Sequence, residues 1–158
     1  MIKVGNTAPN FVLFDSDKQE THLSNLHLDK NLLILFFPQA FTGVCTSELC
    51  SVRDQMARYQ SLNVNVVGIS VDSVFTLAKF KREQGYNFPL LSDFNKEASQ
   101  SYGVLYETFV FGMKGVSKRS AFVVDKNGVI QYAEVLESAG DVPDFEAIVS
   151  VLEDLNAA

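Results

Sequence analysis

The chain alternates between short continuous apolar runs and segments with an apolar residue at every third or fourth position. The continuous runs at 32–37 and 64–70 are short enough for strands, and the first predicts a strand buried on both faces. The spaced segments predict amphipathic helices at about 46–60 and 144–156. Between them we expect a helix capped by Asp72 and Ser73 that ends at Gly85, a short strand at 88–91 with a proline at its edge, and a short helix at 95–102.

Two hairpins complete this pattern. Residues 12–14 and 21–23 flank an Asp/Ser-rich turn and predict a small hairpin beside the main sheet. Residues 120–125 and 129–136 flank Asn127-Gly128, a pair that favours a type I′ turn. Strands that alternate with helices predict an α/β fold, with a central mixed sheet flanked by helices.

The segment 104–118 has no clean period and contains Phe109 and Phe111. Structureless loops of this length are usually functional, so we expect a loop near the functional site or at a partner surface. The two phenylalanines suit the core as well as a subunit contact.

Composition narrows the classes of protein. A chain of 158 residues that is 47% hydrophobic can bury a sizeable core, so residues 1–158 are expected to form a single domain. The net charge of −6 and the lack of a Lys/Arg-rich run argue against nucleic acid as a partner. No apolar run approaches the roughly 20 residues that span a bilayer, and the first residues lack a secretory apolar core. We therefore expect a cytoplasmic protein without a membrane partner, whose two cysteines are candidates for redox chemistry.

Cys45 stands where the apolar strand has ended at Pro38 and a helix is predicted to begin at Thr46. A helix start presents unpaired backbone N–H groups and the positive end of the helix dipole, which stabilise a thiolate. Cys45 is therefore expected to be partly ionised at neutral pH and to act as a nucleophile. A cysteine at such a junction can also be a small buried hydrophobe.

The sequence Phe37-Pro-Gln-Ala-Phe-Thr-Gly-Val-Cys45 contains the spacing Pro-x-x-x-Thr-x-x-Cys. This motif resembles that of the peroxiredoxins and looks most like their alkyl hydroperoxide reductase E branch. The resemblance covers about residues 4–155. It implies a thioredoxin-like fold with an N-terminal hairpin, and a thiol-dependent peroxidase that reduces hydrogen peroxide and organic hydroperoxides in antioxidant defence through a sulfenic acid at Cys45.

Chemistry assigns a task to each residue of the motif. The N–H groups of Val44 and Cys45 can hold the peroxide oxygens, and Gly43 lets the backbone approach closely. The hydroxyl of Thr42 can accept a hydrogen bond from the peroxide and donate one to sulfur. Pro38 is expected to pack over the site and limit water.

Two charged residues enter through the resemblance. The arginine of the family maps by position onto Arg119, whose guanidinium would favour the thiolate, although it could be a surface charge beside Lys118. Glu48 sits where the family usually has an acid and is expected to orient Arg119 through a bidentate pair.

Cys50 lies five residues after Cys45, a spacing similar to the resolving cysteine of the peroxiredoxin Q branch, also called bacterioferritin comigratory protein. Five residues of helix separate the Cα atoms by roughly 8 to 9 Å, whereas a disulfide usually needs less than about 7 Å. The first turns of the helix must therefore unwind if the two cysteines join. Cysteine also packs well on a helix, so Cys50 has a structural alternative.

The expected partners are a peroxide, a thiol reductant and, by resemblance, a second copy of the chain in a homodimer. Thioredoxin suits a two-cysteine route, whereas glutaredoxin or a low-molecular-weight thiol suits one cysteine. An alternative function is a redox-sensing or chaperone-like interaction protein that Cys45 oxidation switches. A copper carrier is disfavoured because His22 and His27 both precede the cysteines, and no metal or other cofactor is expected.

Overall fold

The computed structural model describes residues 1–158. Its strands are β1 (Val12–Asp15), β2 (Glu20–His22), β3 (Asn31–Phe36), β4 (Val64–Ser70), β5 (Leu90–Ser92), β6 (Ser120–Val124) and β7 (Ile130–Val135). They form one seven-stranded sheet in the order β2-β1-β5-β4-β3-β6-β7. Strands β3, β4 and β5 are parallel to one another and the outer strands pair antiparallel, so the central sheet is mixed, as the sequence predicts.

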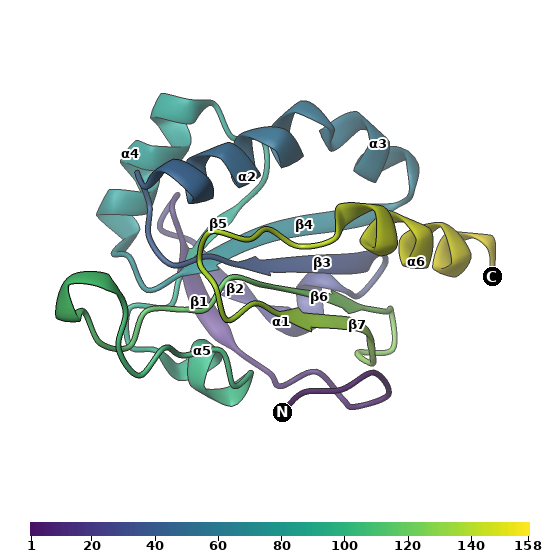
Figure 1. The fold of residues 1–158 in the computed structure, drawn as a ribbon. Helices are drawn as coiled ribbons and strands as arrows, with labels where there is room; N and C mark the ends of the chain where they lie inside the picture. Colours follow the sequence, from purple (N-terminus) through teal and green to yellow (C-terminus); the bar gives the residue numbers. More distant parts are fainter.

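The helices are α1 (Leu23–Leu26), α2 (Gly43–Asp54), α3 (Met56–Ser61), α4 (Val74–Gln84), α5 (Glu97–Ser101) and α6 (Phe145–Ala157), with a 3₁₀ turn at Val110–Gly112. Helices α2, α3 and α4 lie above the sheet in Figure 1, whereas α5 lies below it. Leu23 of α1 belongs to the same core cluster as Ala98 of α5. Two core clusters, of 21 and 16 buried residues, fill the two faces. Every residue of β3 is buried, which explains the unbroken apolar run that follows Asn31 in this strand.

The register between β3 and β6 positions the site. The two strands are antiparallel, and Phe36 at the end of β3 pairs with Ser120 at the start of β6. The residues just after β3 and just before β6 therefore lie together, although about eighty positions of sequence separate them.

The N-terminal hairpin extends this sheet, because β1 pairs with β2 on one side and with β5 on the other. Its second strand ends at His22 rather than at residue 23. Leu23 is buried and begins the short helix α1, which the sequence pattern does not predict.

The helix predicted at 46–60 begins three residues earlier and is interrupted. Helix α2 starts at Gly43 and ends at Asp54, and Gln55 separates it from α3. Thr46 and Ser47 therefore do not cap the helix. Thr42 occupies the N-cap position, where its backbone is extended and its side chain makes no capping bond. Cys45 consequently lies inside the first turn rather than before it.

The turn between β6 and β7 is not type I′, which requires a positive φ at both central residues. Only Gly128 has a positive φ there, of 79°, and its N–H donates to the carbonyl of Asp125. The Asp125 carboxylate also accepts from the backbone of Asn127 and Val129. The side chain at the first position of the turn thus selects a turn that the Asn-Gly pair alone did not predict.

Several ends of elements lie where the sequence places them. The Ser73 hydroxyl caps α4, and Gly85 closes that helix with a φ of 65°. Asp144 caps α6 by accepting from the N–H of Ala147.

The short strand near residue 90 starts later than predicted. Strand β5 starts at Leu90, so Pro89 precedes the strand instead of forming part of it. No helix is both long enough and apolar enough to cross a membrane.

Candidate active site

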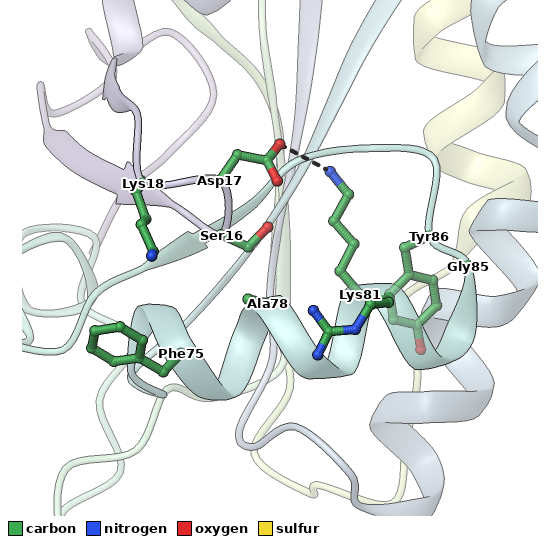
Figure 2. A pocket seen from close by; sticks show the side chains of 9 residues that line it. Ser16, Asp17, Lys18, Phe75, Ala78, Lys81, Gly85 and Tyr86 are labelled. Carbon is green, nitrogen blue, oxygen red and sulfur yellow. Dashed lines mark ion pairs between the residues drawn. The ribbon is translucent and has the colours of Figure 1, made fainter.

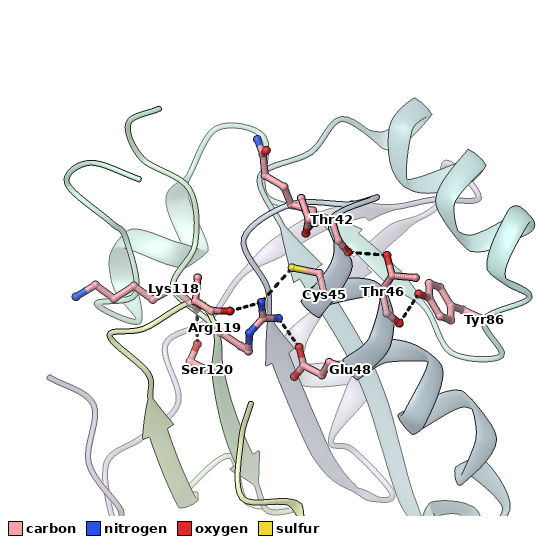
Figure 3. A network of polar contacts seen from close by, with 10 residues as sticks. Thr42, Cys45, Thr46, Glu48, Tyr86, Lys118, Arg119 and Ser120 are labelled. Atoms are coloured by element: carbon pink, nitrogen blue, oxygen red, sulfur yellow. Dashed lines mark hydrogen bonds and ion pairs between the residues drawn. The ribbon is translucent and has the colours of Figure 1, made fainter. Parts of the chain in front are cut away.

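The candidate site lies where the end of β3, the start of β6 and the first turn of α2 meet. The Cys45 sulfur faces the guanidinium of Arg119, with 3.3 Å between Sγ and Nη2 (Figure 3). Both side chains are about 1% exposed. The antiparallel register of β3 and β6 explains this meeting, because Arg119 immediately precedes β6. Arg119 is therefore a buried charge, not a surface neighbour of Lys118.

Arg119 is held by two further acceptors. Its Nη1 donates to Oε1 of Glu48 at 2.7 Å, and its Nη2 donates to the carbonyl of Ala139 at 2.9 Å. The Nη1–Oε1 bond is the only hydrogen bond between Arg119 and Glu48, so the prediction of a bidentate pair is wrong. Glu48 Oε2 and Arg119 Nε are buried without a hydrogen-bond partner. The sequence offered no signal for the carbonyl of Ala139, which a loop after β7 supplies.

The electrostatics of this group follow from burial. Burial raises the pKa of Glu48 to about 7, against the opposing attraction of Arg119. Burial would lower the pKa of Arg119, but the charges of Cys45 and Glu48 outweigh it and hold that pKa above its ordinary value. The guanidinium therefore stays cationic while it faces both an acid and a sulfur.

The loop that carries Pro38 and Thr42 is fixed by hydrogen bonds. The Thr42 hydroxyl donates to the carbonyl of Gln39 at 2.8 Å, so its proton is directed to the loop and not to the sulfur. Its oxygen lone pairs remain able to accept. The carboxylate of Asp72 accepts from the N–H of Ala40 at 2.8 Å, and from the hydroxyl of Ser70 at 2.6 Å. The sequence pattern predicts only a helix cap at Asp72, although an acid two residues beyond the carboxyl end of a buried parallel strand is a signal for a site residue.

A pocket of about 480 Å³ opens onto the sulfur. Its lining includes Pro38, Thr42, Gly43, Val44, Cys45 and Arg119, so it brings together six of the eight predicted site residues. Phe109, Val110, Phe111 and Met113 also line this pocket, so the long loop lies near the site, as expected. The other two residues lie outside the lining: Glu48 behind Arg119, and Cys50.

A larger cavity, of about 670 Å³, lies between the β1–β2 turn and α4 (Figure 2). Lys18, Lys81 and Tyr86 line it, but neither cysteine does. The chemistry, and not the size of the cavity, therefore identifies the candidate site.

Cys50 lies on another side of α2, half-buried against the end of α4. Its sulfur is 3.6 Å from Oε1 of Gln84 and 3.7 Å from the hydroxyl of Tyr86. Both cysteines are free thiols. The structure thus does not bring Cys50 to Cys45, and Gln84 and Tyr86 are neighbours that the sequence did not reveal.

The mixed sheet and its flanking helices form a thioredoxin-like peroxiredoxin fold, and the chain is a thiol-dependent peroxidase by its family and structural relatives. The chain belongs to the AhpC/TSA family, whose sequence model matches residues 4–133. It is 38% identical to alkyl hydroperoxide reductase E of Mycobacterium tuberculosis, over 99% of this chain and 100% of that protein.

Solved structures agree with this assignment. The crystal structure of peroxidoxin BcpB from Mycobacterium tuberculosis has a TM-score of 0.88 and 29% identity, and the match covers 98% of this chain and 99% of that one. A peroxiredoxin-like protein from Aquifex aeolicus has a TM-score of 0.86 and 28% identity, over 98% and 88% of the two chains.

Proposed function

We propose that Cys45 is the peroxidatic nucleophile of this enzyme and reduces hydrogen peroxide and organic hydroperoxides. The observation that carries the proposal is the 3.3 Å contact between Cys45 Sγ and Arg119 Nη2 at the base of the pocket. A buried sulfur gains little from facing a guanidinium unless it carries negative charge, and the thiolate is the nucleophilic form.

In the first step the thiolate attacks one oxygen of the hydroperoxide. An S–O bond forms, the O–O bond breaks, and the departing oxygen takes a proton to leave as water or an alcohol. The sulfur is oxidised to a sulfenic acid while the peroxide is reduced.

The first turn of α2 supplies donors for this step. The N–H groups of Val44 and Cys45 have no carbonyl one turn earlier to bond, and Thr42 does not cap them. They are free to donate to the peroxide oxygens as charge develops on the leaving oxygen. Thr42 accepts from the peroxide hydroxyl, and Gly43 leaves open space beside the backbone.

Cys50 is proposed to resolve the sulfenic acid. Its thiolate attacks the Cys45 sulfur, an S–S bond forms, and hydroxide leaves and is protonated to water. Because an intact helix holds the Cα atoms of residues i and i+5 roughly 8 to 9 Å apart, the start of α2 must open first. A dithiol reductant of the thioredoxin type then restores both thiols. Glutaredoxin or a low-molecular-weight thiol would serve instead if Cys45 is reduced directly.

The setting of this cycle is part of the proposal. A reducing cytoplasm would supply the thiol reductant. The exposed apolar residues Val110 and Phe111 at the pocket would suit a subunit contact in a homodimer.

Rapid mixing with equimolar peroxide, followed by intact mass measurement, tests the cycle. The wild-type protein should first gain one oxygen and then show a net loss of two hydrogens as the disulfide forms. Cys50→Ser should stop at the gain of one oxygen and add more oxygen with excess peroxide. Cys45→Ser should remain unmodified. Oxygen uptake in Cys45→Ser at the wild-type rate would refute the assignment of the nucleophile.

A further inference from the structure

The residues from Gln84 to Asn87, here called the exit segment of α4, hold α2 at several points. The hydroxyl of Tyr86 donates to the carbonyl of Thr46 at 3.4 Å and lies 3.7 Å from the Cys50 sulfur. Gln84 Oε1 accepts from the Cys50 thiol at 3.6 Å. Farther along α2, the guanidinium of Arg53 donates to the Gln84 carbonyl, and the Asn87 amide donates to the Arg53 carbonyl.

The position of Tyr86 is set by packing. Its ring is 4% exposed and lies between Phe80 and Phe88, with centroid distances of 5.1 and 5.5 Å. Burial raises the pKa of Tyr86 far above its ordinary value, so its hydroxyl keeps its proton and remains a donor. Figure 3 shows this hydroxyl directed at the first turns of α2.

The two groups that Tyr86 contacts delimit one helical turn. In an α-helix the carbonyl of residue i accepts from the N–H of residue i+4, so Thr46 and Cys50 begin and end the same turn. This is the turn that must open before Cys50 can reach Cys45. Opening it breaks the contacts of the Tyr86 hydroxyl as well as the helical bond.

We propose that Tyr86 is a positioning residue that keeps the turn from Thr46 to Cys50 closed, and thereby sets how fast Cys50 resolves the sulfenic acid. This inference rests on the proposed function, because it assumes that Cys45 is oxidised and Cys50 resolves it. A closed turn prolongs the life of the sulfenic acid. A second peroxide then has time to oxidise it to the sulfinic acid, transferring one oxygen and leaving as water or an alcohol.

Tyr86→Phe tests the proposal, because it keeps the packed ring and removes only the hydroxyl. Loss of a single hydrogen bond should speed disulfide formation by roughly three- to tenfold. Correspondingly more peroxide should be needed for half-maximal oxidation to the sulfinic acid. Formation of the sulfenic acid should keep its rate, and Tyr102→Phe serves as control because its hydroxyl bonds the carbonyl of Pro9 on the other face of the sheet. Rapid quenching and intact mass separate the two steps.

A double variant distinguishes positioning from general loosening. In the Cys50→Ser background, Tyr86→Phe should no longer change the sensitivity to overoxidation, because there is no disulfide left to accelerate. An equal effect with and without Cys50 would overturn the proposal, as would an unchanged rate of disulfide formation.

The same experiment separates this inference from the proposed function. If the wild-type Cys45 gains no oxygen, the proposed function itself fails. If it gains oxygen but the wild type never forms the disulfide, the resolving role of Cys50 fails. If both steps occur and Tyr86→Phe matches the wild type, only the role of Tyr86 fails.

Discussion

Replacing Arg119 tests the electrostatic basis of the site most directly. Arg119→Met removes the positive charge 3.3 Å from the Cys45 sulfur while keeping an unbranched side chain of similar reach. The Cys45 sulfur then loses the only Lys or Arg side chain that lines the pocket, and with it the stabilisation of the negative charge that the proposed nucleophile carries.

The magnitude can be bounded from the contact. At the 3.3 Å of this contact, two unit charges attract by about 5 kcal/mol at an effective dielectric constant of 20. This value is an upper bound because Glu48 shares the guanidinium. A hydrogen bond to a charged group contributes about 1.5 to 3 kcal/mol. A loss of this size corresponds to a decrease of roughly ten- to a hundredfold in the rate constant of peroxide reduction.

Two measurements check this expectation. Alkylation of Cys45 by iodoacetamide at pH 7 should slow, and stopped-flow peroxide consumption should slow by the same factor. Arg119→Lys keeps the charge but loses the planar guanidinium, so its two rates should lie between those of the wild type and of Arg119→Met. Urea denaturation must show that the variants are folded, because an unpaired buried acid costs about 3 to 5 kcal/mol. A folded Arg119→Met variant within twofold of the wild-type peroxide rate would refute the reasoning.

Two further predictions concern neighbouring acids. Burial raises the pKa of Glu48 from 4.5 to about 7, so the native state favours its protonated form; the resulting stability is present below about pH 4.5 and is lost as pH rises through 7. Glu48→Gln should not show this loss. Between pH 4.5 and pH 7 its free energy of unfolding, measured by urea titration, should therefore increase relative to that of the wild type by up to about 3 kcal/mol. A difference between the two proteins that does not vary with pH would contradict the prediction. Asp72→Ala removes the acceptor of the Ala40 N–H and of the Ser70 hydroxyl. It should destabilise the fold by about 1 to 3 kcal/mol and slow peroxide reduction. Asp72→Asn can still accept from Ala40, so its stability and its peroxide rate should fall less. Equal peroxide rates in both Asp72 variants and the wild type would show that the loop does not need this anchor.

The order of strands and helices could be predicted from the sequence because it depends on local pattern. The unbroken apolar run of β3, the capping serine at 73 and the glycine at 85 act within a few residues of their positions. The candidate site motif could be recognised for the same reason, since Pro38, Thr42 and Cys45 lie within one loop and one helical turn.

Local pattern was less reliable where two signals compete. Thr46 and Ser47 are good capping residues, yet Thr42 takes the N-cap position three residues earlier, where the backbone leaves β3 in an extended conformation. The Asp125 carboxylate similarly overrides the preference of Asn127-Gly128. In each case the sequence contained both signals but not their relative strength.

Tertiary structure alone decided which distant groups meet. Only the family resemblance pointed to Arg119, whereas the antiparallel pairing of β3 with β6 is what brings it to the sulfur of Cys45. The return of the chain after β7 adds the carbonyl of Ala139. The exit segment of α4 reaches Cys50 in the same way. Sequence patterns encode which elements form and which face is apolar, but the distance between side chains on different elements depends on strand order and register, which only the packed sheet determines.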